Sequence, residues 1–427
     1  MIFLFVFIAI FLYFSWKRPL WTLGFILFTL PIYQFRFHLF IPFTLLEAEI
    51  LILFFVSLIR FAYTKQKIVF PNRLHSYIII AFLLIASFAV FYSPVLKKAA
   101  GFWKAYFIEP VLLSLIALNL VRSKKNVLFL VKSLAFGAFW IGLWAIGQKF
   151  FGGGVMSMED WGKPEVWRAT GPFPHPNFLG LYLGPLLPLC LGLFFQERKV
   201  SEKALWISAF FIGAVALILA RSEGAILAVG LATFLFLFFA GKKERNIAIF
   251  LLIIALMLFS LNLLSLRDKI ITKITFQDLS GQLRLNIWDG AFKMLKDSPI
   301  FGVGLGGYQK LAPFYQEKYY SKTGELISVE THPYPHNLFL SIYLELGVFG
   351  FLVFCLIIGL FFAQGISLLK EKEYFIVLGV NLSMLAILIH SLVDTPYFKN
   401  DLSVLFWILF SFPLSFHKSQ NFGVQRT

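Results

Sequence analysis

Charged residues and cysteines are scarce in this chain, and each shortage excludes a class of protein. Only 14% of the residues are charged, whereas 59% are hydrophobic and 19% are aromatic. Soluble globular domains carry about 25% charged residues, so this composition excludes a soluble globular protein. The two cysteines, Cys190 and Cys355, both lie inside apolar runs. The sequence therefore offers neither a disulfide framework nor a CxxC metal or redox site.

Long apolar runs make up most of the chain instead. A helix of about 20 apolar residues spans a bilayer, and we find thirteen candidate spans, of which the first two are short. They cover residues 2–16, 20–34, 43–61, 75–92, 102–121, 127–149, 177–195, 204–220, 223–240, 246–266, 337–362, 374–391 and 402–416. The sequence predicts an all-α polytopic membrane protein with about 12–13 transmembrane helices, folded as a single membrane domain over residues 1–427.

Lys and Arg outnumber Asp and Glu by 38 to 22, which gives a formal net charge of +16. The cations form short clusters between apolar runs rather than one basic face, so we predict no nucleic-acid partner. Cytoplasmic loops of membrane proteins are enriched in Lys and Arg, and every second connection here is basic. The basic connections carry Lys17 and Arg18; Lys65, Lys67 and Arg73; Arg122, Lys124 and Lys125; Arg198, Lys199 and Lys203; Lys242, Lys243 and Arg245; Lys370 and Lys372; and Lys418 and Arg426. The main exception is the set Lys97, Lys98 and Lys104.

The remaining connections are then non-cytoplasmic. They include the one long polar insert, residues 267–336, together with the 150–176 loop, the turn at Arg221 and the 391–401 turn. We expect the insert to form one large outer loop containing short helices. Because these four segments meet the same membrane face, their polar residues are the candidates for a functional site.

Arg221 lies between two closely joined apolar runs, in ALILARSEGAILAVG. An arginine near membrane depth costs free energy unless it is paired or faces a polar cavity, so it is a functional candidate. The structural alternative is an ion pair with Glu223 or extension of the side chain to the interface.

Arg284 lies in RLNIWDGAFKML, whose spacing predicts an amphipathic helix on the bilayer surface. The apolar positions are Leu285, Trp288, Ala291, Phe292 and Leu295. A second arginine on the same face as Arg221 would suit a diphosphate, because the guanidinium is a planar, permanently charged set of donors. Alternatively, Arg284 is only a surface charge on this helix.

His336 ends the polar insert, directly before a long apolar span. A neutral imidazole can take a proton from a hydroxyl near neutral pH; alternatively, its ring caps the following helix or packs on Tyr334. His332 lies four residues earlier, but Pro333 and Pro335 prevent the helix that would align the two histidines. We therefore predict neither a metal nor another cofactor.

Other polar residues in the outer segments are possible accessory residues of the site. They are Arg168, His175, Asn177, Asn337 and Asp394. For Arg168, His175 and Asn177, the structural alternative is that they only lead into the helix that begins around Pro176 and Asn177. Asp394 is either an N-cap or a partner for an outer-face arginine or histidine.

Gly302, Gly304 and Gly307 match the pattern GxGxxG. No strand of a βαβ unit precedes them, which is the context that dinucleotide binding requires. The glycines therefore predict turns and close packing.

Five segments, taken in order, resemble the O-antigen ligase family, which also includes O-antigen polymerases. They are GPFPHPNFLGLYL at 171–183, RSEG at 221–224, RLNIWDGAFKMLKDSPIFGVGLGGY at 284–308, PHNLFLSIYLELGVFG at 335–350 and HSLVD at 390–394. The likeness covers about 160–400 and includes the outer loop 267–336. The family often has SRG where this chain has RSEG.

The resemblance implies a multi-pass glycosyltransferase of the bacterial inner (cytoplasmic) membrane whose active face is periplasmic. It implies that an undecaprenyl-diphosphate-linked glycan is transferred with inversion and without a metal. The acceptor would be lipid A-core or another glycan or protein, and membrane lipids would surround the enzyme. Carried over by motif, Arg221 and Arg284 would bind the diphosphate, and His336 would act on the acceptor hydroxyl.

Two alternatives stay open. A polymerase of the same family would join lipid-linked repeats, and the sequence does not separate it from a ligase. A transporter or flippase for lipid-linked sugars is the alternative from another class. Charges at mid-span and repeat symmetry would favour a transporter, whereas the polar residues of this chain gather at one face.

The alternation of Lys and Arg generates a topology prediction. In intact cells, Ser157→Cys and Ser321→Cys should react with a membrane-impermeant thiol reagent, and Ser201→Cys should react only after the inner membrane is permeabilised. Labelling of Ser201→Cys together with protection of Ser321→Cys would invert the topology and contradict a periplasmic site.

Overall fold

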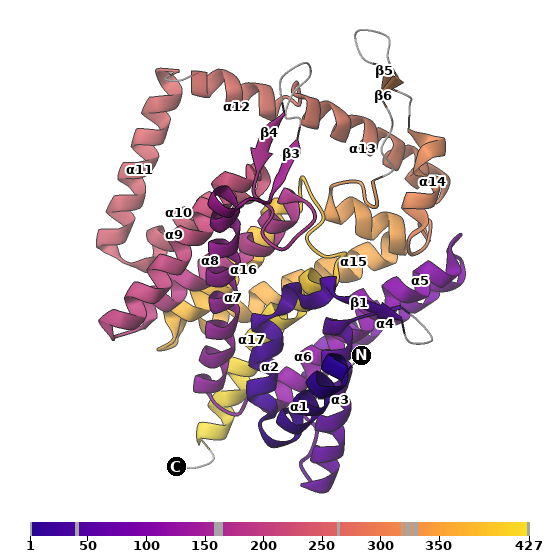
Figure 1. Ribbon diagram of the computed structural model, residues 1–427, viewed down its shortest axis with the longest axis vertical. Helices are drawn as coiled ribbons and strands as arrows, with labels where there is room; N and C mark the ends of the chain where they lie inside the picture. The colour runs from indigo at the N-terminus through magenta and orange to yellow at the C-terminus, as the bar shows by residue number, and fades with distance from the viewer. Residues whose placement is uncertain are drawn as a thin grey trace.

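The computed structural model describes residues 2–38, 42–157, 165–262, 265–316, 319–320, 326–327 and 332–424, most of which are helical (Figure 1). The helices of the first half are α1 (Ile2–Lys17), α2 (Pro19–Phe28), α3 (Leu45–Tyr63), α4 (Arg73–Phe91), α5 (Leu96–Trp103), α6 (Glu109–Leu120) and α7 (Lys124–Phe151). Those of the second half are α8 (Pro176–Gln196), α9 (Val200–Ala220), α10 (Glu223–Ala240), α11 (Lys242–Ser260), α12 (Leu266–Ile274), α13 (Leu279–Asp297), α14 (Gly307–Tyr315), α15 (Leu338–Ser367), α16 (Tyr374–His390) and α17 (Asn400–Val424).

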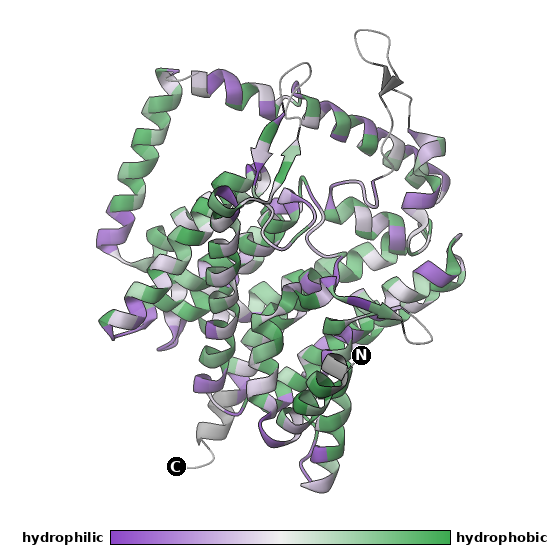
Figure 2. Ribbon diagram, viewed as in Figure 1, coloured by the Kyte–Doolittle hydropathy of each residue, from purple (hydrophilic) through white to green (hydrophobic). Residues whose placement is uncertain are grey.

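The predicted fold class is confirmed, because each of the thirteen predicted spans coincides with a helical segment. Among the described residues, seven helical segments are long and apolar enough to cross a membrane. They are α4, the stretch Leu96–Leu120, α7, α8, α9, α10 and the stretch Leu338–Lys370. Helix α11 is green along most of its length in Figure 2, and Ala248 is its one buried residue. An apolar helix with so little buried surface is suited to contact with the lipid of a bilayer.

The second predicted span, 20–34, is not one continuous helix. Helix α2 ends at Phe28, and a 3₁₀ turn, Leu30–Gln34, follows it. Pro31 lies in the first turn of that segment. A proline inside an α-helix lacks the N–H of the ladder and clashes with the preceding turn, so the α-helix ends before it.

Helix α8 lies at the centre of the second half, where it packs against α7, α9, α10 and α16. Most of its residues are buried, and α16 is buried to a similar degree. These two helices carry the segments that begin and end at the polar face: His175 precedes α8, and Ser391 follows α16.

Short hairpins occupy some of the connections. Strands β1 (Arg36–His38) and β2 (Pro42–Thr44), β3 (Val155–Ser157) and β4 (Val166–Arg168), and β5 (Tyr319–Tyr320) and β6 (Leu326–Ile327) form three antiparallel pairs. Arg36 lies opposite Thr44, Val155 opposite Arg168 and Tyr319 opposite Ile327. The second hairpin therefore holds Arg168 at the end of the predicted 150–176 loop.

The predicted outer insert contains α12, α13 and α14, and Figure 1 shows α12 and α13 crossing the top of the molecule. The helix expected around Arg284 exists, but its predicted apolar face is partly wrong. Leu285 and Phe292 are 46% and 56% exposed. The buried face consists of Ile287, Ala291, Met294 and Leu295. Helix α13 packs on α14 and α15, and this packing leaves the other two apolar side chains outside.

Two glycines join the insert to α15. Gly302 has φ +69° and Gly347, inside α15, has φ +71°. A Cβ atom would lie 2.2 Å from the Leu344 carbonyl oxygen at Gly302 and 2.1 Å from the Ile300 carbonyl oxygen at Gly347. The turn role predicted for the glycine-rich segment is confirmed at Gly302 and at Gly304, whose φ is +79°.

Gly347→Ala should destabilise the protein by roughly 1–3 kcal/mol, because a Cβ at positive φ is strained and meets a fixed carbonyl. Gly359→Ala on the same helix is the matched control, since nothing lies within 4 Å of its added Cβ. Thermal unfolding of the detergent-solubilised protein measures both. Equal melting temperatures for the two variants would contradict this account of the turn.

Candidate functional site

Arg168 joins three segments of the polar face. Its Nε donates to the Ala220 carbonyl oxygen at 2.8 Å. Its Nη2 donates to Asn177 Oδ1 at 2.9 Å and to the Arg221 carbonyl oxygen at 3.3 Å. The guanidinium thereby connects β4, the start of α8 and the turn between α9 and α10. His175 is the N-cap of α8, and its Nδ1 accepts from the Asn177 N–H at 3.2 Å.

Arg221 ends α9 in a left-handed conformation, with φ 49°, and is exposed. Glu223, the alternative partner weighed for it from sequence, lies 3.0 Å from Lys273 Nζ of α12. The same ammonium lies 2.8 Å from Asp278, the N-cap of α13. Lys273 therefore ties the turn that holds Arg221 to the beginning of the helix that holds Arg284. Partial burial lowers the pKa of Lys273, but its bonds to Asp278 and Glu223 outweigh burial, so the net shift is upward.

Arg284 is half-buried and oriented by two contacts. Its Nε donates to the Val393 carbonyl oxygen at 3.1 Å, and its Nη1 donates to Ser280 Oγ at 2.7 Å. A guanidinium has five N–H donors, so after these two bonds most of its donors have no partner among the residues that the structure describes. The Val393 contact also places Arg284 beside Asp394.

His336 lies against this same turn. Its Nδ1 is 3.3 Å from Asp394 Oδ1, and its backbone has φ 50°. Trp288 Nε1 of α13 donates to the Pro335 carbonyl oxygen at 2.8 Å, which fixes the segment before it. Asn337 is the N-cap of α15, since its Oδ1 accepts from the Leu340 N–H at 2.9 Å.

These contacts bear on the structural alternatives for His336. The helix cap is Asn337, and Tyr334 stacks on Phe398 with ring centroids 4.6 Å apart. The His336 ring lies edge-on to His332 at 4.8 Å. Asn337 also donates from Nδ2 to the Leu392 carbonyl oxygen at 3.1 Å, so α15 is joined to the turn that contains Asp394.

The electrostatics of the turn favour the ionised form of Asp394 and the neutral forms of His332 and His175. Burial alone raises the pKa of Asp394, but the hydrogen bond and charge of His336 and the Thr395 N–H outweigh it, and the net shift is downward. Burial lowers the pKa of His332 to about 4, and the charge of His336 adds to this effect. Burial and the charge of Arg168 likewise lower the pKa of His175.

Sequence reasoning missed Lys399, which lies in the 391–401 turn. Its Nζ lies 3.5 Å from the ring centroid of Phe178 and 5.1 Å from those of Phe173 and Tyr33. Within the described residues this Nζ is buried without a hydrogen-bond partner. Burial lowers the pKa of Lys399 to about 8, although the charges of Asp401 and Asp394 raise it. A lysine in an outer turn, where few cations are expected, was the available signal.

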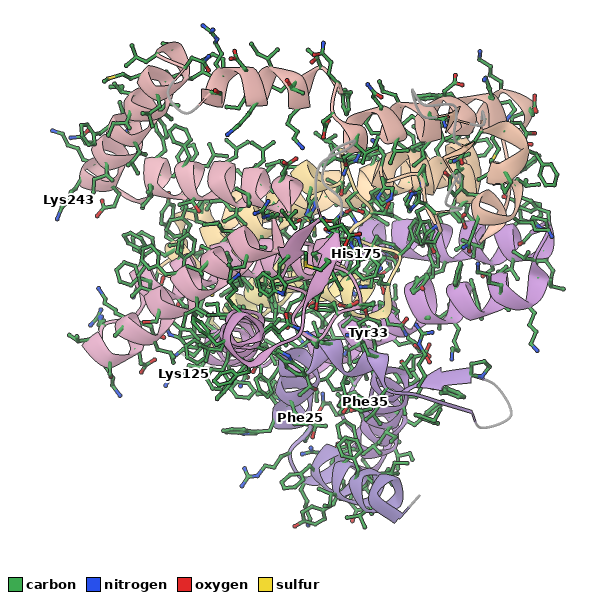
Figure 3. The ribbon with its side chains drawn as sticks, turned by 45° about the horizontal axis from the view of Figure 1, so that its top comes forward. Phe25, Tyr33, Phe35, Lys125, His175 and Lys243 are labelled. Carbon is green, nitrogen blue, oxygen red and sulfur yellow. The ribbon has the colours of Figure 1, made fainter. Side chains whose placement is uncertain are left out.

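The site thus draws on segments that are far apart in the chain. Figure 3, with the top of the molecule turned forward, shows Tyr33 and His175 near its middle. The residues that the site brings together are Arg168, His175, Asn177, Arg284, His336, Asn337, Asp394 and Lys399, with the backbone of Arg221. His390, also missed, is buried at the end of α16, and a Cβ at Gly224 would lie 2.7 Å from its Cδ2.

Residues 208–355 match the model of the O-antigen ligase family. Over this segment, which is about a third of its length, the chain is similar to that family. The matched segment runs from α9 into α15 and contains Arg221, Arg284 and His336, which confirms the resemblance stated from sequence. No curated protein matches the chain. A protein of this family is a membrane glycosyltransferase of the ligase or polymerase type, which uses a lipid-linked glycan donor and a glycan acceptor.

Proposed function

We propose that this protein, which is similar to the O-antigen ligase family over residues 208–355, transfers an undecaprenyl-diphosphate-linked glycan to an acceptor hydroxyl, such as one on lipid A-core. The reaction takes place at the periplasmic face of the inner membrane. One observation supports this proposal most strongly: Arg284 donates to Val393, and the next residue, Asp394, contacts His336. A cation for a leaving diphosphate and a base for an incoming hydroxyl are therefore held by one turn.

The arginines act on the donor. When the acceptor oxygen attacks the anomeric carbon, the bond between that carbon and the diphosphate oxygen breaks, and the diphosphate leaves with the electron pair. Preorganised cations stabilise such developing charge strongly where water is scarce. Arg284 offers its remaining donors to the diphosphate oxygens, and Arg221, held through Lys273 beside the same helix, supplies the second guanidinium.

His336 acts on the acceptor. With its Nδ1–H donated to Asp394, the lone pair of the imidazole is on Nε2, which takes the proton of the attacking hydroxyl. Asp394 remains a carboxylate, orients the ring and stabilises the imidazolium that forms. Attack opposite the departing diphosphate inverts the anomeric carbon.

The remaining polar residues hold the site in place, and the reaction needs no metal. Asp394, the carboxylate that contacts the histidine, is already bonded to His336 and to the Thr395 N–H. The guanidinium groups supply the positive charge that a divalent ion would otherwise bring to the diphosphate. Arg168 and Asn177 position the turn at Arg221 through the bonds described above, and Asn337 does so for the start of α15.

Glycan analysis of a deletion strain tests the proposed reaction. We expect long lipid-linked polymer to accumulate without ligation, because polymerisation would continue and transfer to the acceptor would stop. Lipid-linked single repeats in place of polymer would identify a polymerase and contradict the ligase assignment.

Variants of the purified protein separate the two halves of the site. With defined donor and acceptor, His336→Ala should bind donor normally but transfer glycan roughly 10²–10⁴-fold more slowly, the contribution of a positioned base. Arg284→Lys should lose donor affinity, since an ammonium cannot reproduce the guanidinium fork.

His417→Ala, an exposed histidine near the other end of α17, is the matched control. Transfer at the wild-type rate by His336→Ala would remove the base from the mechanism. A rate abolished by EDTA and restored by a divalent ion would contradict the metal-free reaction.

A further inference from the structure

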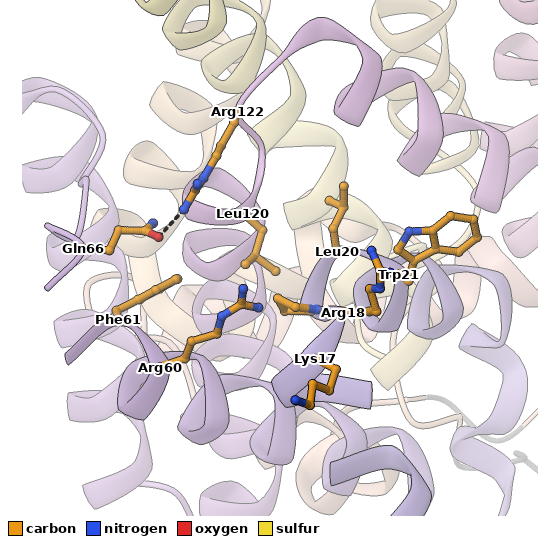
Figure 4. Close-up of a pocket in the computed structure, with 10 residues that line it drawn as sticks. Lys17, Arg18, Leu20, Trp21, Arg60, Phe61, Gln66, Leu120 and Arg122 are labelled. Atoms are coloured by element: carbon orange, nitrogen blue, oxygen red, sulfur yellow. Dashed lines mark hydrogen bonds between the residues drawn. The ribbon is translucent and has the colours of Figure 1, made fainter. Parts of the chain in front are cut away.

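A second polar feature lies at the ends of α1, α3 and α6. A cavity of about 230 Å³ lies there, bordered by the turn between α1 and α2. Figure 4 shows the residues that line it. Its lining contains four cations, Lys17, Arg18, Arg60 and Arg122, and no acidic residue. The connections at this end of the helices belong to the basic set, so the cavity lies on the opposite face from the transfer site.

The described residues provide no carboxylate partner for these charges. Within the described part of the chain, none of the four cations forms a salt bridge with a carboxylate. Arg122 Nη2 donates to Gln66 Oε1, and Arg60 Nη1 is buried with no hydrogen-bond partner among those residues. Burying an unsatisfied charged donor is costly. Four cations around one small cavity also repel each other, so the arrangement favours a bound anion.

The surroundings of the cavity are those of a membrane interface. Trp21, which lines it, is 64% exposed, and Tyr63 at the end of α3 is 79% exposed. The Tyr63 ring lies 6.0 Å from that of Trp16. Trp and Tyr gather at the level of lipid headgroups. On the membrane side of these rings, α1 exposes Ile10 and Phe14, which are 52% and 48% accessible.

We propose that this cavity binds the phosphodiester headgroup of an anionic phospholipid of the cytoplasmic leaflet. The four cations would contact the phosphate, and the acyl chains would lie along the exposed apolar side of α1. Basic pockets between transmembrane helices on the cytoplasmic side suit anionic headgroups. The adjoining apolar surface favours a lipid over free phosphate, which would gain nothing from it.

Lipid binding by the full-length, detergent-solubilised protein tests this site. Native mass spectrometry would follow titration with dioleoyl phosphatidylglycerol and, separately, with the zwitterionic dioleoyl phosphatidylcholine. We expect preference for phosphatidylglycerol in the wild type. Arg18→Gln combined with Arg60→Gln should weaken that binding roughly 30-fold, because each Lys or Arg near an anionic lipid contributes about fivefold.

Lys242→Gln combined with Lys243→Gln is the matched control, since it removes the same charge from exposed positions on the same predicted face. Equal loss in the control, equal binding of both lipids, or unchanged binding by the cavity variant would each overturn the proposal. Displacement of the lipid by millimolar inorganic phosphate would assign the cavity to free phosphate and overturn the lipid. Arg18→Gln alone changes only the turn between α1 and α2, and it should still cost about fivefold if the paired variant does not fold.

Discussion

The low polarity of the bilayer is the constraint on which the rest of the structure depends. A backbone that crosses a membrane must satisfy its own hydrogen bonds, so helices fill the membrane and polar chemistry is confined to their ends. Helices α8, α9, α10, α15, α16 and α17 all begin or end at the same polar face. A site at that face can draw on residues from the whole chain, because the helices align segments that are far apart in sequence.

Hydrogen bonds between helix ends hold the segments of the candidate site in fixed positions relative to one another. Arg168 joins three ends at once, Asn337 links the start of α15 to the turn after α16, and Arg284 reaches the same turn from α13. The Leu338 N–H donates to the Ser391 carbonyl oxygen at 2.9 Å and reinforces that link. Most of these bonds involve backbone carbonyls that a helix end leaves free, so groups with no partner in their own helix position the functional side chains.

The sequence predicted the fold more completely than it predicted the contacts of the candidate site. Apolar runs and the alternation of Lys and Arg depend on local composition, which is why the spans were predicted well. The apolar face of α13 was partly wrong, because Leu285 and Phe292 fit a helical stripe and only the packing partners α14 and α15 determine which positions are covered. The pair of His336 and Asp394, 58 residues apart, was open in the sequence to several partners. Lys399 was missed, since nothing in a single lysine after Tyr397 and Phe398 reveals three aromatic rings around it.

Four cations of the predicted outer face differ in the contacts that they make. Arg168 gives its donors to backbone and amide oxygens, so it is part of the framework. Lys273 is neutralised by two carboxylates. Arg284 uses two donors and keeps the others, and Lys399 is buried against aromatic rings with no hydrogen-bond acceptor among the described residues. Charge that is buried but not neutralised costs folding free energy, and a diphosphate would recover that cost on binding. Under the proposed function, these cations are the ones that would bind the negative charge of the donor.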